Sequence, residues 1–218
     1  DFGTCIENID IGGPSMLRSA AKNFESVAVV TRPASYDAIL AEMRANDGAT
    51  LRDTRAKLAL DVFETTAAYD GAIAAWMGAQ LKDEGDVKFP ADRTLHLSKV
   101  QDLRYGENPH QSAAFYRRDD YADAPHSLAH AKQHQGKELS YNNYLDLDAA
   151  WTAVREFDEP ACVIVKHLTP CGICVDKDVT TAYKRAHECD PVSAYGGVMA
   201  FNRPVTSDVV VAIFDNKQ

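Results

Sequence analysis

The chain has 218 residues, of which 45% are hydrophobic and 25% are charged, and its formal net charge is −9 at pH 7. This composition is typical of a globular protein with one large or two small domains. The acidic balance, with no basic run longer than Arg117-Arg118, argues against nucleic-acid binding, which needs a cationic surface. No apolar stretch approaches the roughly 20 residues of a membrane span, and no signal peptide is visible, so we expect no membrane partner.

Five cysteines in a chain of this length favour reduced thiols in the cytoplasm, because a disulfide framework pairs cysteines in even numbers. Both ends of the sequence resemble interruptions. Asp1-Phe2-Gly3 leads directly into a patterned segment, and no strand pattern follows the last helical one. We therefore expect this chain to be a piece of a longer polypeptide.

The first 80 residues predict mostly helices. Helices are expected over residues 12–23, 33–44 and 50–77, and a short buried strand is expected over residues 26–31. Pro14 fits the first turn of a helix, where its missing N–H has no partner to lose. Thr50 and Asp53 resemble a capping box at the start of the long helix, which Gly71 can break or kink.

A candidate linker follows, because residues 82–92 are polar and charged, contain Gly85 and Pro90, and have no sustained period. Beyond it, strands are expected over residues 95–100, 113–116, 161–165 and 198–201, and helices over residues 146–157, 180–188 and 207–214. Strands that alternate with helices predict an α/β fold in two domains.

A Lys-His pair, Lys166 and His167, ends the apolar run of residues 161–165 and precedes a Thr-Pro-Cys-Gly turn. In open α/β sheets, ligands bind at strand ends. Repulsion from the neighbouring ammonium lowers the proton affinity of the imidazole, which keeps it neutral and able to act as a base. Taken alone, however, the pair is better explained as a solvated lysine and a hydrogen-bonded turn histidine.

Residues 104–111 predict a rigid polar loop that binds a ligand. Arg104 offers a planar fork suited to phosphate or carboxylate, and Tyr105 offers a flat face on which a base can stack. His110 belongs to the same loop. A surface loop with a local salt bridge is the weaker explanation, because the polar residue types are so concentrated here.

Two further blocks combine polar side chains or glycines with an element boundary. Asn142 and Asn143 precede a helix, and their amides can both donate and accept hydrogen bonds, although an Asx turn explains one of the two. Gly196 and Gly197 precede a strand and let the backbone approach a ligand closely, although a strand-entry turn explains them equally well.

Near the start of the chain, Asp10 precedes a helix on which Arg18 and Lys22 share one face. A carboxylate and an ammonium in this arrangement can surround a polar substrate. The spacing alone favours a helix-capping aspartate and a solvated basic face.

One competing motif is the P-C-x-x-C of residues 170–174, which matches half of the zinc deaminase pattern. The other half needs a histidine followed two residues later by a catalytic glutamate, and none of the seven histidines meets this condition. Two thiolates without that pair do not make a catalytic zinc site, so we expect no metal.

Five blocks together resemble the bifunctional family that joins phosphoribosylaminoimidazolecarboxamide (AICAR) formyltransferase to IMP cyclohydrolase in purine biosynthesis. They are residues 9–23, 103–111, 139–143, 165–167 and 190–197. Their order and approximate spacing extend over nearly the whole chain. The resemblance places the chain in the middle of the family's polypeptide, without the first strand and loop of the cyclohydrolase domain and without the second half of the transformylase domain.

The resemblance implies that residues 1–90 are the C-terminal part of an IMP cyclohydrolase domain with a Rossmann-like, methylglyoxal-synthase-like fold. It implies that residues 91–218 are the N-terminal part of an AICAR transformylase domain, similar to the cytidine deaminase fold without its metal. A homodimer in the intact protein and 10-formyltetrahydrofolate as co-substrate are also implied. The folate-gripping residues then lie outside this chain, which we expect to be inactive alone.

The resemblance also implies roles for individual residues. His167 accepts a proton from the 5-amino group of AICAR, and Lys166 supports the charge that develops during formyl transfer. Asp10 and Lys22 line the site where formyl-AICAR closes to IMP. The AICAR-binding positions are Arg104, Tyr105, His110, Asn143 and Gly196. Two alternatives stay open: a zinc-dependent nucleoside deaminase, and a module that binds a purine nucleotide without catalysis.

Overall fold

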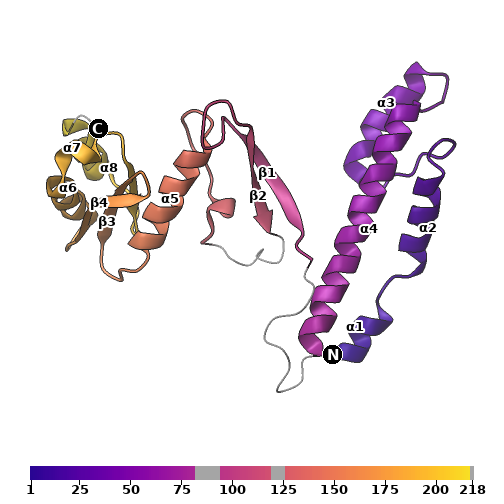
Figure 1. Ribbon diagram of the computed structural model, residues 1–218, viewed down its shortest axis with the longest axis horizontal. Coiled ribbons are helices and arrows are strands. Elements are labelled where there is room, and N and C mark those ends of the chain that lie inside the picture. The colour runs from indigo at the N-terminus through magenta and orange to yellow at the C-terminus, as the bar shows by residue number, and fades with distance from the viewer. Residues whose placement is uncertain (82–93, 119–125, 217–218) are drawn as a thin grey trace. The chain divides into compact units, whose positions relative to one another are not determined.

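The computed structural model describes residues 1–81, 94–118 and 126–216. The chain divides into two compact units, Asp1–His96 and Leu97–Gln218, which are indigo to purple and magenta to yellow in Figure 1. The expected linker over residues 82–92 lies outside the described residues. Together the two units make a mixed α/β protein, as predicted. In the described parts of the chain, no helix is both long and apolar enough to cross a bilayer.

The described part of the first unit is built of helices. They are α1 (Phe2–Glu7), α2 (Gly12–Lys22), the 3₁₀ helix η1 (Pro33–Ser35), α3 (Tyr36–Ala45) and α4 (Arg52–Gln80). Helix α2 packs on α4, where Ala21 meets Ala59 and Val62 in a small buried cluster. The predicted helices are confirmed with shifted ends, and α4 continues through Gly71 without a break.

The predicted strand over residues 26–31 is wrong. Val27 to Val30 have no regular secondary structure and pair with no strand among the described residues. β-branched side chains favour an extended backbone, whereas a strand also needs a neighbour whose N–H and C=O groups face its own. The sequence pattern indicates the preference for an extended backbone but not the presence of a neighbouring strand.

The predicted capping box at Thr50 and Asp53 is also wrong, because α4 begins after Leu51 and receives its cap from another helix. The Glu42 carboxylate on α3 accepts the Leu51 N–H at 2.6 Å and the Thr54 hydroxyl at 2.5 Å. These two bonds hold the pKa of Glu42 below its usual range. A negative charge at the positive end of α4 also stabilises the helix dipole.

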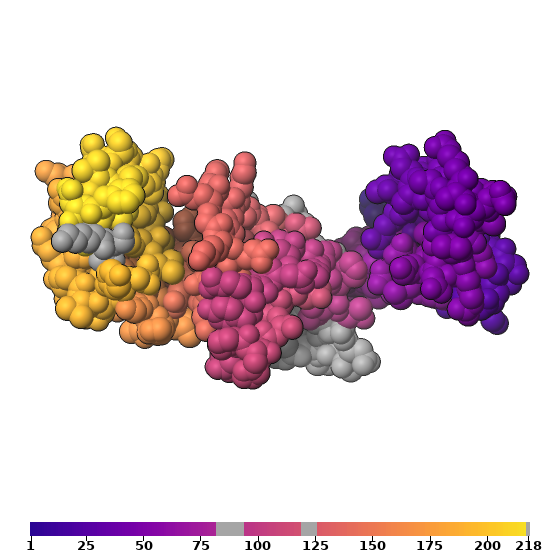
Figure 2. Space-filling model, turned by 90° about the horizontal axis from the view of Figure 1, so that it is seen from above, coloured from indigo at the N-terminus to yellow at the C-terminus, as the bar shows by residue number. Residues whose placement is uncertain are grey.

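The second unit contains a three-stranded sheet in the order β4-β3-β5, with β3 (Ala161–Lys166) antiparallel to both β4 (Thr169–Val175) and β5 (Val198–Phe201). Helix α5 (Tyr141–Val154) covers one face. Helices α6 (Val179–Cys189), α7 (Pro191–Ala194) and α8 (Ser207–Asp215) lie on the other side (Figure 1). Helix α8, in yellow, reaches the surface of this unit (Figure 2).

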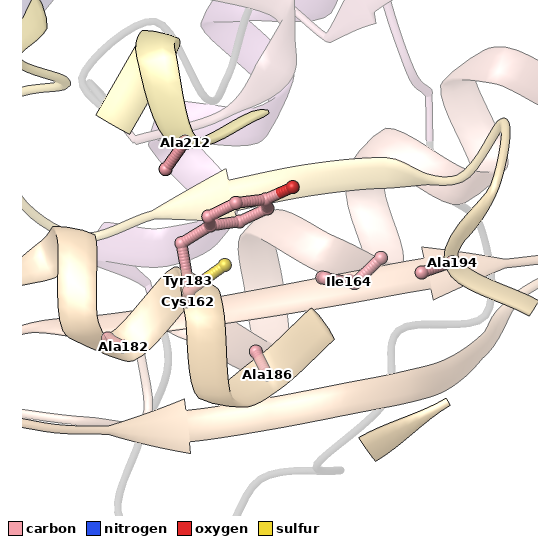
Figure 3. Packing of buried hydrophobic residues seen from close by; sticks show 7 residues of the cluster. All are labelled: Cys162, Ile164, Ala182, Tyr183, Ala186, Ala194 and Ala212. Atoms are coloured by element: carbon pink, nitrogen blue, oxygen red, sulfur yellow. The ribbon is translucent and has the colours of Figure 1, made fainter. Parts of the chain in front are cut away.

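Strand β3 is the centre of this core. Ala161, Val163 and Val165 pack toward α5, and the alternate residues Cys162 and Ile164 pack toward α6. Figure 3 shows the Tyr183 ring of α6 beside Cys162. Burial on both faces explains why the run 161–165 is continuously apolar. The same burial raises the pKa of the Cys162 thiol to about 12.

A β-hairpin precedes α5 in the same unit. Strand β1 (Leu97–Leu103) pairs antiparallel with β2 (Ala113–Arg118), and the 3₁₀ helix η3 (Leu128–His130) follows. Phe115 of β2 stacks on Tyr144 of α5 with ring centroids 4.3 Å apart. Gln101 of β1 donates a hydrogen bond to the Tyr144 hydroxyl at 2.9 Å. These contacts attach the hairpin to α5.

Two boundaries in this unit differ from the prediction. Thr-Pro-Cys-Gly is not a turn that stops the chain, because it begins β4, with Pro170 at an irregularity of the ladder where its missing N–H is tolerated. The chain turns earlier, at His167 and Leu168. Helix α5 starts at Tyr141 and not at Asp146, since Ser140 caps it. Helices α1 and α7 were not predicted.

Gly172 of β4 tests how tightly α6 packs on the sheet. A Cβ atom built at Gly172 overlaps the Ala186 carbonyl of α6, whereas one at Gly78 in α4 meets nothing within 4 Å. We expect Gly172→Ala to lower the free energy of unfolding by at least about 2 kcal/mol. Gly78→Ala is expected to raise it by about 0.5–1 kcal/mol. Urea unfolding measures both, and a neutral Gly172→Ala would contradict the close contact.

The Glu42 cap predicts a pH dependence. Because the folded-state pKa of Glu42 is lowered, its contribution to stability is present above the unfolded-state pKa of about 4.3 and is lost as the pH falls through the lower folded-state pKa. Glu42→Gln should therefore make the free energy of unfolding of the first unit depend less on pH in this acidic range. Asp37→Asn, which removes an exposed carboxylate from the same helix, is the control. Parallel curves for wild type and Glu42→Gln would contradict the prediction.

Candidate functional site

The polar loop of residues 104–111 leaves β1 and lies against the start of α5. The Arg104 N–H donates to the Leu139 carbonyl at 3.0 Å, and the Tyr141 N–H donates to the Tyr105 carbonyl at 3.1 Å. These backbone bonds bring together two blocks that are separate in the sequence. The Arg-Tyr pair and the Asn pair therefore belong to one local structure.

Internal hydrogen bonds close the loop on itself. The Gly106 N–H donates to the Gln111 carbonyl at 2.8 Å, and the Asn108 N–H donates to the side-chain oxygen of Gln111 at 2.8 Å. Gly106 is buried, and a Cβ atom there would come within 3.0 Å of the Gln111 side chain. His110 lies exposed in the turn of this loop. The backbone and the side chain of Gln111 thus both close the loop on itself.

The Arg104 guanidinium lies over the Tyr105 ring, 4.9 Å from its centroid, and donates to the Tyr105 hydroxyl at 3.2 Å. A hydrogen bond with Ser140, and then the bond and the charge of Arg104, lower the pKa of the Tyr105 phenol. The phenol and the guanidinium together present hydrogen-bond donors with a positive charge. Such a pair suits an anionic or phosphorylated ligand.

Ser140 connects this pair to α5. Its hydroxyl is buried and forms a capping box, in which the Asn143 N–H donates to Ser140 Oγ at 3.3 Å and Asn143 Oδ1 accepts the Ser140 N–H at 3.0 Å. Asn142 donates its side-chain amide to the Glu107 carbonyl at 3.1 Å. Both asparagines thus have hydrogen-bond partners within the protein. These partners explain the two side chains without a ligand.

His167 and Leu168 form the two-residue turn between β3 and β4. Both have left-handed backbone angles, with φ of 55° and 65°. This is the pattern of a type I′ hairpin, in which Asn-Gly is the favoured pair. Neither residue here is a glycine, so the turn is strained. The His167 side chain is exposed at the tip.

Lys166 lies next to this turn, at the end of β3. Its Nζ donates to the Tyr195 carbonyl at 2.7 Å, which brings the ammonium beside Gly196. Gly196 has φ of 71°, a left-handed conformation that glycine adopts without strain. Gly197 follows in tight packing, because a Cβ atom there would lie 3.0 Å from the Val165 carbonyl. The Lys-His block and the Gly-Gly block are therefore neighbours.

The remaining connection is Asp146, which the sequence analysis placed only on a helix. Its Oδ1 accepts the Leu168 N–H at 2.8 Å, a bond between residues 22 positions apart. Asp146 lies three residues after Asn143 and hence on the same face of α5. Through α5, contacts join four of the predicted blocks within the second unit.

In the first unit the structure does not bring Asp10 and Lys22 together. Asp10 Oδ1 accepts the Gly13 N–H at 2.9 Å at the start of α2, while Lys22 is exposed in its last turn. An 11-residue helix is about 16 Å long. Asp10 therefore has the capping role that its spacing favoured. The Asp10 N–H also donates to the Tyr69 hydroxyl of α4 at 2.7 Å.

The two cysteines of the P-C-x-x-C motif, Cys171 and Cys174, lie on β4 and pack at the edge of the core around Cys162. The Cys171 thiol donates to the Ile164 carbonyl at 3.5 Å. Over residues 1–81, 94–118 and 126–216, no group of three or more His, Cys, Asp or Glu side chains is placed to hold a metal ion. The described chain thus offers no donor set for zinc.

Two comparisons with known proteins bear on this chain. A family model described as the AICARFT/IMPCHase bienzyme matches residues 20–217. The bifunctional purine biosynthesis protein PurH of Neisseria meningitidis serogroup A / serotype 4A is 54% identical over an alignment that covers 97% of this chain and 41% of that protein. The chain thus spans about two fifths of the length of this curated relative.

Ser140→Ala tests the connection between Tyr105 and α5. Because the Ser140 hydroxyl is the main cause of the lowered pKa of Tyr105, its removal should move that pKa upward. Asn143→Ala is the matched control, since it breaks the same capping box but leaves the Ser140 hydroxyl. NMR titration of the Tyr105 ring carbons gives the values. An equal effect of the two substitutions would show that loss of the cap, not of the hydroxyl, moves the phenol.

Proposed function

Because the chain belongs to the AICARFT/IMPCHase bienzyme family, we propose that it carries residues of both active sites of a bifunctional purine-biosynthesis enzyme. The first reaction transfers a formyl group from 10-formyltetrahydrofolate to AICAR. The second closes formyl-AICAR to IMP with loss of water. The proposal rests on one observation above all: α5 joins the Arg-Tyr loop to the turn that carries His167.

The proposal includes the domain assignment. Residues 1–90 form the C-terminal part of a Rossmann-like, methylglyoxal-synthase-like cyclohydrolase domain, and residues 91–218 form the first part of a cytidine-deaminase-like transformylase domain. The intact protein is a cytoplasmic homodimer, and this chain alone does not complete either site. Support comes from the family match, which extends over parts of both units, and from the division of the chain into two units between His96 and Leu97.

In formyl transfer, the amine of AICAR attacks the formyl carbon, so that a new C–N bond forms while the bond between that carbon and N10 of the folate breaks. The exposed His167 imidazole accepts the proton that the amine loses, and this proton then goes to N10, which leaves as tetrahydrofolate. Lys166 supplies a fixed positive charge for the oxygen of the intermediate. Its bond to the Tyr195 carbonyl supports this role, because it holds the ammonium beside Gly196.

The nucleotide is held by the loop at the start of α5. Arg104 and Tyr105 provide charge and hydrogen-bond donors for the phosphorylated substrate, and Asn143, His110 and Gly196 line the same region. The lowered pKa of Tyr105 supports this assignment, since it reports a positive, hydrogen-bonding environment. Asp10 and Lys22 belong to the cyclohydrolase site, to which they contribute from the two ends of α2.

His167→Ala tests the base in the full-length protein that contains this sequence. We expect kcat for formyl transfer to fall by about 10²–10⁴-fold, with a much smaller change in the KM for AICAR, because a base acts mainly in the transition state. His130→Ala, which removes an exposed histidine of η3, is the control. The isolated 218-residue chain is expected to show no turnover in the same assay.

Equal losses of rate and nucleotide affinity in His167→Ala would contradict the base and favour a module that only binds nucleotide. Titration of AICAR into Lys166→Ala and His167→Ala variants separates the two readings further. Binding that survives while turnover is lost supports catalysis at this pair. Normal turnover by the isolated chain would contradict the proposal that its sites are incomplete.

A further inference from the structure

The turn that carries His167 needs an external support. An L-residue in the left-handed region brings its Cβ atom close to the following carbonyl, and two such residues in succession make the turn unfavourable without glycine. His167 and Leu168 both adopt this conformation. The sequence alone therefore favours a wider or differently folded connection between β3 and β4.

Side-chain burial does not provide this support. Leu168 is 53% exposed and His167 is exposed, so neither residue is anchored in the core. Within the turn, the Thr169 hydroxyl reaches the His167 carbonyl only at 3.5 Å, the limit of a hydrogen bond. The strand register, in which Lys166 pairs with Thr169, fixes the two ends of the turn but not the peptide between its central residues.

The Asp146 carboxylate provides the missing contact. It accepts the Leu168 N–H at 2.8 Å, a charge-assisted bond to the peptide group that joins the two strained residues. Rotation of that peptide would both break this bond and turn the His167 side chain. Asp146 is part of the rigid, capped helix α5, which also holds Asn143 and the Arg-Tyr loop.

We propose that Asp146 is a positioning residue, whose carboxylate holds the left-handed His167–Leu168 turn and thereby fixes the imidazole relative to the nucleotide loop. The backbone part of this inference stands on geometry alone, and the catalytic part rests on the proposed function of His167. Asp146 itself does not contact the reacting atoms in this scheme.

The backbone part is tested on this chain by NMR. In Asp146→Ala, the Leu168 amide should exchange with solvent about 10- to 100-fold faster, as expected for loss of a hydrogen bond to a charged group. The left-handed carbon shifts of residues 167 and 168 should disappear, while amides within β3 stay protected. Asp146→Asn, which keeps an acceptor oxygen, should retain most of the protection. Asp148→Ala removes an exposed carboxylate from the same helix and is the matched control.

A second substitution distinguishes a local effect on the turn from a general loss of structure. Leu168→Gly removes the steric penalty at this position, so adding it to Asp146→Ala should restore the left-handed turn. Unchanged Leu168 protection and unchanged His167 shifts in Asp146→Ala would overturn the proposal. Loss of protection throughout β3 in Asp146→Ala, without recovery by Leu168→Gly, would also overturn it, because Asp146 would then support the whole fold.

The catalytic part is tested in the full-length protein. Asp146→Ala should lower kcat for formyl transfer at least about tenfold with little change in the KM for AICAR, and Asp146→Asn should recover most of the rate. A disturbed turn with normal kcat would overturn the positioning role. If the wild-type protein transfers no formyl group, the proposed function fails, whereas the NMR experiment still decides whether Asp146 holds the turn.

Discussion

The arrangement of the second unit depends on the first two turns of α5 and on the buried hydroxyl that caps them. A buried polar atom must be hydrogen-bonded, and Ser140 satisfies this requirement with Asn143 on the helix and Tyr105 on the loop. One residue thus caps the helix and also lowers the pKa of the Tyr105 phenol on the loop. From the same helix, Asp146 reaches the β3–β4 turn. Residues that lie close together on α5 therefore contact segments that are far apart in the sequence.

In the first unit, charged side chains likewise connect a helix start to segments that are distant in the sequence. Glu42 caps α4 from α3, and Arg55 of α4 donates to the carbonyls of Phe24 and Glu25 at 2.8 and 2.9 Å. Arg52 adds an ion pair to Glu25. These bonds tie the segment after α2 and the end of α3 to one helix terminus. The polar groups of connecting segments are thus satisfied by side chains, where no described strand pairs with them.

Elements with a strong local signal were predictable from the sequence. The apolar run 161–165 is a fully buried strand, and the helical periods near residues 180 and 207 mark α6 and α8. The failures are places where a distant partner decides the structure. Val27 to Val30 lack a paired strand, β4 was hidden by Pro170 and Gly172, and the start of α5 is set by Ser140.

For the candidate site too, local sequence signals predicted some features, and contacts between distant residues determined the others. Residue types predicted which blocks matter, and contacts within the second unit join four of these blocks around α5. Their chemical roles stay predictions. Asp146 escaped notice because its importance depends on two backbone angles at His167 and Leu168, which no pattern of residue types reveals. Asp10 shows the converse, since its simple capping role was readable from spacing alone.

The burial of Cys162 has a practical consequence. A thiol enclosed between sheet and helix with so high a pKa holds almost no thiolate at neutral pH, and burial raises the pKa of Cys171 as well. Cys5 and Cys189, by contrast, are exposed, one in each unit. Maleimide dyes will therefore react at these two surface thiols ahead of Cys162 and Cys171. The sequence thus provides one exposed thiol in each unit, so the distance between the two units can be followed by energy transfer between attached dyes.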